Sequence, residues 1–392
     1  MKKFLSFTFC LLILTCSLFT LDFGLVLDQS AEYGGSGSDS AFGYKGILIP
    51  KVSGLLGESG GFYISAGANY EFDPLDILPE LLRTDLYLHN GNLEFRLGRM
   101  QYQDPLGYIA TGLFDGARLS FDSEAGTFSA GGWYTGFLNK IRANIEMTNK
   151  EQEQNATALD YSDFTNTYFA PRRVLSALEW EHQGLGERIP AKLSLLGQFD
   201  LGDKPLHSQY LAGKMSIPAG SLVFDLGGCL EFLQVSGDSS SAFAAEAGIT
   251  WRMSAQQFAL LGRYSSGNDG SITAFQPLTT VSQGYILKPK LSGLSLISLD
   301  YTARLQRTLS IGISTLYFIR SNISSGDSDS YPFYGNDGHL LGAEFYAGLY
   351  WAPVSDMMIN LGGGAFMPSL GNVAPEAERL WRFEANVIIS FF

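Results

Sequence analysis

Apolar and polar residues alternate with a period of two along most of this chain. The segment 381–391 shows the pattern clearly: Trp381, Phe383, Ala385, Val387, Ile389 and Phe391 alternate with Arg382, Glu384, Asn386 and Ser390. Similar runs occupy 19–28, 62–72, 222–232, 243–252, 297–305 and 341–351. A period of two places successive side chains on opposite faces of a strand. The pattern therefore predicts many β-strands, each with one apolar and one polar face.

The connections between these strands alternate between short and long. Short turns fall near 58–61, 90–92, 122–126, 219–220, 254–256, 306–308 and 354–356. Long polar connections fall at 29–40, 139–172, 266–293, 321–339 and 368–379. Short turns at one end and long loops at the other are typical of outer-membrane barrels. The first and last strands both meet the short-turn end, so the count is even, and we count about eighteen strands, within a range of about 16–18.

Hydropathy separates this chain from helical membrane proteins. The chain has 392 residues, 45% of them hydrophobic, and its mean hydropathy is only +0.06. Beyond the N-terminal segment, no apolar run reaches the roughly 18 residues that a spanning helix needs. Lipid is spanned only by helices or closed barrels, and a barrel needs only half of each strand to be apolar. A soluble all-β sandwich is the alternative, but the apolar faces are too long and too aromatic for it.

The predicted fold class is therefore all-β, a transmembrane antiparallel β-barrel over residues 18–392. The first strand follows the N-terminal segment directly, so no plug domain is expected. Residues 1–17 read as a signal peptide, because two lysines at 2–3 precede an apolar run and Thr15 and Ser17 provide small residues for cleavage. An uncleaved anchor and a lipoprotein signal ending at Cys16 are the alternatives.

Export sets the expected surroundings of the protein. Localisation in the cell outer membrane would make the lipid bilayer, with lipopolysaccharide or an equivalent outer leaflet, its main partner. Two of the three cysteines lie in the signal peptide and Cys229 is left alone, so no internal disulfide is possible. The net charge is −13 and no basic patch is present, so nucleic acid is not an expected partner.

Charged residues occupy the polar parity of the strands, which would face the lumen. The candidate pore-lining and selectivity residues are Arg83, Asp85, Glu94, Arg96, Arg118, Arg252, Arg263 and Arg304. A basic side chain on the lipid face would cost about 2–4 kcal/mol near the bilayer midplane, so confinement to one parity supports the barrel. Rings of charge can select solutes by sign. The alternative is a wall of mutually paired charges without selectivity.

The long connection 139–172 is the candidate constriction loop. It carries Arg142, Arg172 and Arg173 as cationic contributors. Long loops of barrels can fold into the lumen and narrow it. An ordinary outer loop is the competing interpretation.

Two neighbouring strand segments carry a short motif. Arg96, Gly98, Arg99 and Gln101 are followed across a short loop by Phe114, Asp115 and Arg118. These segments are similar to the "R-x-G-R-Q" and "F-D-x-x-R" strands of the alginate-export and related substrate-specific porins. The resemblance implies an eighteen-stranded channel and leaves the substrate open. The chain departs from the pattern at Met100, and Arg99 falls on the lipid-facing parity, which calls for a bulge or a position above the membrane.

The last strand carries a second resemblance. It resembles the closing strand of outer-membrane barrels, whose terminal aromatic residue is read by the insertion machinery, so that machinery is an expected partner.

Catalysis finds little support in the sequence. The four histidines, His89, His182, His207 and His339, lack the spacing of a metal site. A Gly-x-Ser-x-Gly match at 57–61 precedes a strand rather than a helix. No catalytic residues, metal or cofactor are expected, and the protein is not expected to be an enzyme. The predicted function is an outer-membrane porin for small hydrophilic solutes, anions among them; the alternative is an adhesin or ligand-binding barrel acting through its outer loops.

Overall fold

The computed structural model describes residues 21–71, 76–186, 188–235, 237–269, 272–322 and 338–392. The predicted signal peptide at 1–17 and most of the predicted long loop at 321–339 lie outside the described residues.

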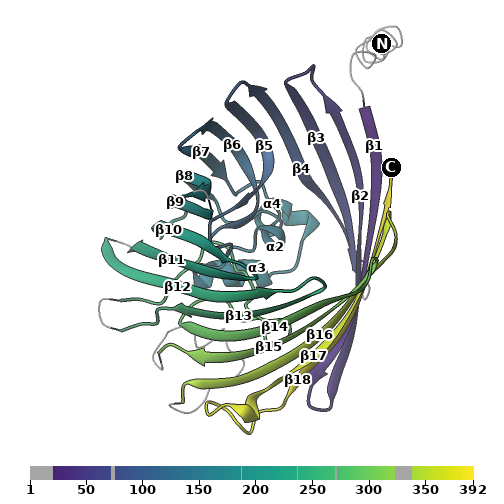
Figure 1. The fold of residues 1–392 in the computed structure, drawn as a ribbon, viewed down its shortest axis with the longest axis vertical. Coiled ribbons are helices and arrows are strands. Elements are labelled where there is room, and N and C mark those ends of the chain that lie inside the picture. The colour runs from purple at the N-terminus through teal and green to yellow at the C-terminus, as the bar shows by residue number, and fades with distance from the viewer. Residues whose placement is uncertain (1–20, 72–75, 187, 236, 270–271, 323–337) are drawn as a thin grey trace.

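Eighteen strands within the described residues form one closed antiparallel sheet, as the sequence predicted (Figure 1). Each strand pairs with its neighbours in the chain, and β18 pairs with β1 from Leu25 opposite Phe391 to Ser36 opposite Leu380. The strands are β1 (Leu21–Ser36), β2 (Asp39–Leu55), β3 (Gly60–Glu71), β4 (Asp76–Asn90), β5 (Leu93–Gln103), β6 (Thr111–Ser123), β7 (Gly126–Tyr134), β8 (Arg173–Leu185), β9 (Ile189–Asp200), β10 (Leu206–Ala219), β11 (Leu222–Val235), β12 (Asp238–Arg252), β13 (Gln256–Ser265), β14 (Leu294–Gln306), β15 (Leu309–Arg320), β16 (Leu340–Val354), β17 (Met357–Met367) and β18 (Leu380–Phe391).

Side-chain exposure follows the alternation of the sequence. On β10 and β11, Leu211 and Leu230 are about half exposed on the outside of the ring, whereas Ala212 and Cys229 are buried on the inside. An apolar outer face on a closed sheet fits the hydrocarbon of a bilayer, because every wall strand has hydrogen-bonding partners within the protein. None of the helices in the described residues is both long and apolar enough to cross a bilayer.

One predicted long connection is wrong. The polar stretch 29–40 is not a loop: β1 continues to Ser36, β2 begins at Asp39, and only a tight turn separates them. The stretch keeps its period of two, with Gln29, Ala31 and Tyr33 on one face, so it continues the strands beyond the apolar belt. Polarity alone misread a strand extension as a loop.

Three connections at the long-loop end fold into the ring. They are 104–110, 135–172 and the described residues of 266–293. The second contains α2 (Lys140–Ala143), α3 (Asn149–Ala156), η1 (Tyr161–Asp163) and α4 (Phe164–Thr167), and Figure 1 shows the three α-helices inside the ring. Their apolar side chains share one buried cluster with inward-facing strand residues, among them Tyr108, Ile145 and Phe275 from the loops and Trp133, Tyr210 and Phe318 from the strands. A short turn, η3 (Pro368–Leu370), follows β17. The lumen is therefore partly filled by a packed core.

Adjacent leucines on β13 test which face meets lipid. Leu260 is half exposed on the outer face, and Leu261 lies on the inner one. We expect Leu260→Arg to reduce the free energy of folding into lipid vesicles by about 2–4 kcal/mol, because a cation on the lipid face loses hydration. Leu261→Arg is the matched control and should change it much less. Urea titration of both refolded variants measures the difference, and equal losses would contradict the assignment of the faces.

Candidate functional site

A buried carboxylate held by two arginines forms the first charged cluster of the lumen. Asp85 on β4 is 3% exposed. Arg83 on the same strand donates to it at 2.6 Å, and Arg96 on β5 donates through both Nε and Nη2. A buried carboxylate needs compensating charge and hydrogen bonds, which the two guanidinium groups supply.

Two further clusters repeat this arrangement along the wall. Glu179 on β8 accepts Arg118 of β6 at 2.9 Å and Lys192 of β9 at 3.5 Å. The second cluster, around Glu246 of β12, contains Lys214 of β10 and Arg263 of β13, both at 2.8 Å. Glu179 was not among the predicted lumen residues, although it shares the inward parity of β8 with Arg173 and Leu175.

The three clusters adjoin one another in the ladder. Arg96 lies opposite Arg118, Lys192 lies opposite Lys214, and Glu246 lies opposite Arg263. The six cationic side chains keep 18–36% of their surface exposed, whereas the three carboxylates keep only 2–3%. We call these cations the cationic band: Arg83, Arg96, Arg118, Lys192, Lys214 and Arg263. Each cluster carries one net positive charge, and the positive groups face the lumen.

The other predicted lumen residues lie outside this band. Glu94 is half-buried opposite Ser120. Arg252 and Arg304 are exposed close to the short turns, where their backbone N–H groups bond to Ser221 and Ala255. They therefore lie at the short-turn end of the lumen.

A cavity of about 580 Å³ lies between the barrel wall and the connection 135–172. The wall side comes from β1 to β4 and β18, and α2 faces it. Its polar lining includes Asp28, Lys45, Glu71, Asn386 and Arg142. Arg142, a predicted constriction residue, donates through Nε at 3.1 Å and Nη2 at 3.0 Å to Glu80 of β4. Arg142 therefore lines the cavity with its charge compensated.

The connection 135–172 is internally braced. Lys140 is buried and donates to the carbonyl oxygens of Gln154 at 2.8 Å and Thr157 at 2.6 Å, at the C-terminal end of α3. Thr148 and Glu151 form a reciprocal capping box at the other end of α3. Burial lowers the pKa of Lys140. The segment is thus a folded element inside the ring rather than an ordinary outer loop.

Arg173 is placed differently from the sequence expectation. Its side chain is fully buried, donating to Glu151 at 2.9 Å from Nε and to Gln198 at 2.6 Å, with Asp200 at 3.4 Å. It fixes α3 to the wall and has no surface to offer a solute. Arg172, the residue before it, is exposed on the opposite parity at the end of the loop.

The connection 104–110 crosses the lumen, a feature that the sequence analysis missed. Asp104 is buried, and its carboxylate accepts four backbone N–H groups of this turn, from Leu106, Gly107, Ile109 and Ala110, at 2.8–3.0 Å. Burial raises the pKa of Asp104, and these N–H groups act in the opposite direction. Tyr108 lies under the guanidinium of Arg263, 4.5 Å from its ring centre. The turn therefore abuts the cationic band.

Buried carboxylates also anchor the connection 266–293. Glu344 of β16 accepts the N–H groups of Tyr285 at 2.6 Å and Leu287 at 2.9 Å, and Glu231 of β11 accepts that of Gln276 at 2.8 Å. The ring of Tyr285 stacks on Tyr346 at 4.2 Å. These contacts hold the segment along the inner wall.

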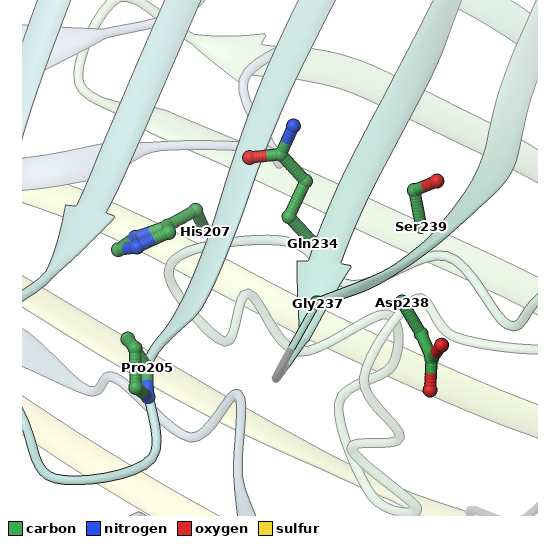
Figure 2. A pocket seen from close by; sticks show the side chains of 6 residues that line it. All are labelled: Pro205, His207, Gln234, Gly237, Asp238 and Ser239. Atoms are coloured by element: carbon green, nitrogen blue, oxygen red, sulfur yellow. The ribbon is translucent and has the colours of Figure 1, made fainter.

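The rim of the barrel carries a smaller pocket of about 330 Å³, shown in Figure 2. It is lined by Pro205, His207, Gln234, Gly237, Asp238 and Ser239, between the β9–β10 connection and the start of β12. His207 accepts the backbone N–H of Asp200 through Nδ1, so its ring serves the turn. The pocket contains no part of the cationic band. No group of three metal-ligating side chains occurs in the part of the chain that the structure describes.

Comparison with solved structures identifies the architecture. The chain resembles OccK2 (OpdF) of Pseudomonas aeruginosa, crystallised with glucuronate, with 15% sequence identity and a TM-score of 0.65, over 95% of this chain and 98% of that one. It also resembles OccK5 (OpdH) of the same organism, with 14% identity and a TM-score of 0.64, over 94% of this chain and 98% of that one. A third similar structure is OpdL of Pseudomonas aeruginosa, with 14% identity and a TM-score of 0.62, over 95% of this chain and 99% of that one. No protein-family model matches the chain, and no curated protein sequence matches it. The similarity establishes the fold.

The burial of Arg173 gives a prediction for the braced loop. We expect Arg173→Ala to destabilise the loop by about 3–5 kcal/mol, because the largely buried carboxylates of Glu151 and Asp200 would lose the cation that pairs with them. Limited proteolysis within 149–167 should become much faster in this variant. The control is Arg172→Ala, at the exposed neighbouring residue, which should be cleaved at the wild-type rate. Equal protection of both variants would show that the Arg173 network does not hold the loop.

Proposed function

We propose that this protein is an outer-membrane channel for small hydrophilic solutes, with a preference for anions. The proposal is supported above all by the cationic band, in which six partly exposed cations stand in front of three buried carboxylates. The barrel form, the apolar outer face and the polar lumen supply the setting. The end that carries the long loops would face the cell exterior.

Charge arrangement supports the anion preference more directly than charge count does. The chain as a whole carries −13, which would favour cations if it were spread evenly. In the band the carboxylates are covered and the cations reach the lumen, so a passing solute would meet positive groups first. Within a narrow passage such charges select by sign. The OccK2 structure contains glucuronate, a carboxylate.

The wall formed by β18 and β1 to β4 would contact other polar groups of the solute. The cavity against α2 offers Asp28, Asn69 and Asn386 as well as Lys45. Arg382 pairs there with Glu32 at 2.9 Å and also donates to the carbonyl oxygen of Tyr285. Mixed charges and amides suit polar solutes, which would exchange hydration for these groups.

Conductance of the protein refolded into a planar bilayer is the primary test. An open channel should give discrete current steps at low voltage. A folded barrel that gives no steps would refute the channel, and binding through the outer loops would then be the function to examine.

The band predicts a change of ion selectivity. In Arg96→Ala/Arg118→Ala, Asp85 and Glu179 each lose one of two cations, so the local net charge falls by two. If this loss removes about 1 kcal/mol of attraction between the band and a passing anion, the anion-to-cation permeability ratio should fall roughly five-fold. Reversal potentials in a salt gradient measure it. Arg307→Ala, in a short turn, is the control, and an unchanged reversal potential in the double variant would remove these arginines from the selectivity mechanism.

A further inference from the structure

The hairpin of β5 and β6 leaves the barrel wall at its long-loop end. The ladder between β4 and β5 stops at Thr84 opposite Arg99, and that between β6 and β7 stops at Asp115 opposite Tyr134. The strands β5 and β6 nevertheless stay paired with each other as far as Gln103. Beyond Arg99 and Asp115 the hairpin is therefore a two-stranded ribbon without ladder partners on either side.

Two glycines form the bend where the ribbon leaves. Gly98 and Gly116 lie opposite each other, one residue below Arg99 and Asp115. Gly98 has φ +118°, and a Cβ there would lie 1.7 Å from the carbonyl oxygen of Thr84. A Cβ on Gly116 would lie 2.1 Å from the carbonyl oxygen of Gly132. Only glycine permits these close approaches of the backbone.

Beyond the bend the ribbon lies in the lumen. Met100, Tyr102 and Phe114 are buried. The turn that follows crosses to the far wall, where Leu106 Cδ2 would lie 2.5 Å from a Cβ on Gly227 of β11. The backbone N–H of Thr279, in the connection 266–293, donates to Ile109 at 3.1 Å. The ribbon therefore narrows the passage.

Its departure leaves an edge of β4 without a ladder partner, and side chains replace the missing strand. Tyr161 donates to the carbonyl oxygen of Ile77 at 2.7 Å, Tyr168 donates to Pro79 at 3.3 Å, and Arg99 donates to Leu81. These carbonyls alternate along β4, as the acceptors facing one neighbouring strand do. An unpaired backbone carbonyl in a membrane wall is costly, so this closure is a structural requirement.

Arg99 connects three segments at this place. Its Nε and Nη2 atoms donate to the two carboxylate oxygens of Asp115 at 2.9 and 2.8 Å. Nη1 donates to Leu81 of β4, and Nη2 also donates to the carbonyl oxygen of Phe137 at 3.0 Å, at the start of the connection 135–172. Arg99 is only 4% exposed, although it sits on the outward parity.

We propose that Arg99 is a positioning residue that sets the width of the channel. By closing the wall behind the bend, it holds the β5–β6 ribbon inside the lumen. Without the Arg99 side chain, the Asp115 carboxylate and the Leu81 carbonyl lose their donors. The ribbon would then form more backbone hydrogen bonds by returning to the wall, where β4 and β7 offer ladder partners. Arg99 acts without touching a solute. The inference rests on the proposed channel only for its electrical readout.

Conductance and solute size test the proposal together. Arg99→Leu should raise single-channel conductance at least two-fold and admit larger neutral sugars in liposome swelling, while anion preference persists because the cationic band is intact. Arg99→Lys, which retains the charge but loses the forked donor geometry, should fall between it and the wild type. Gln101→Ala, on the same strand and parity, is the control. Wild-type conductance and size limit in a folded Arg99→Leu channel would overturn the proposal.

A disulfide separates ribbon position from general destabilisation. Leu106→Cys and Gly227→Cys, in a Cys229→Ser background, should cross-link readily when Arg99 is present and at least five-fold more slowly with Arg99→Leu. Once formed, the bond should return the Arg99→Leu channel to wild-type conductance, and a reductant should reverse this. If Arg99→Leu does not refold, Asp115→Asn replaces it in the same experiment, because it weakens the same Arg99–Asp115 pair. Equal cross-linking rates would refute the inference even if the protein conducts no current, so its failure is distinguishable from that of the channel.

Discussion

Every backbone hydrogen-bonding group in a membrane wall must find a partner inside the protein, and this constraint shapes the whole molecule. The eighteen-stranded ring satisfies it through continuous ladders, including the closure of β18 on β1. At one place that departs from this solution, the β5–β6 hairpin turns inward. There, Tyr161, Tyr168 and Arg99 supply the donors that a strand would have supplied. The inward turn is thus possible because the connection 135–172 returns to close the wall.

The same constraint acts on charge inside the lumen. A carboxylate buried against the wall is costly unless it is paired and hydrogen-bonded. Asp85, Glu179 and Glu246 each obtain two cations from neighbouring inward positions, and the cations remain partly exposed. Pairing of these charges is therefore compatible with the proposed selection of solutes. The carboxylates fix the cations in place, and the excess positive charge is what the lumen presents.

The alternation in the sequence predicted the strands of the wall but not the packing of the loops inside the lumen. Strict alternation placed Arg96 and Arg118 on inward positions and yielded the strand count, because a period of two is a local property. The partner of Arg118 was missed because β8 begins within a polar stretch that has no clear boundary. Arg173 looked like a loop cation, since its burial depends on Glu151, which lies 22 residues away in the chain, and on Asp200 across the ladder. Such contacts depend on tertiary packing, which periodicity does not encode.

The motif shared by β5 and β6 places charge in the passage and also forms the inward bend of the hairpin. Arg96 and Arg118 face each other on the inner side, while Arg99 and Asp115 face each other on the outer side. Between the two pairs, Gly98 and Gly116 provide the bend. The parity of Arg99, which looked anomalous from sequence, follows from this arrangement: below the glycines an outward charge would meet lipid, but at the bend it meets the edge of β4. One strand pair therefore supplies charge to the passage and also turns inward to narrow it.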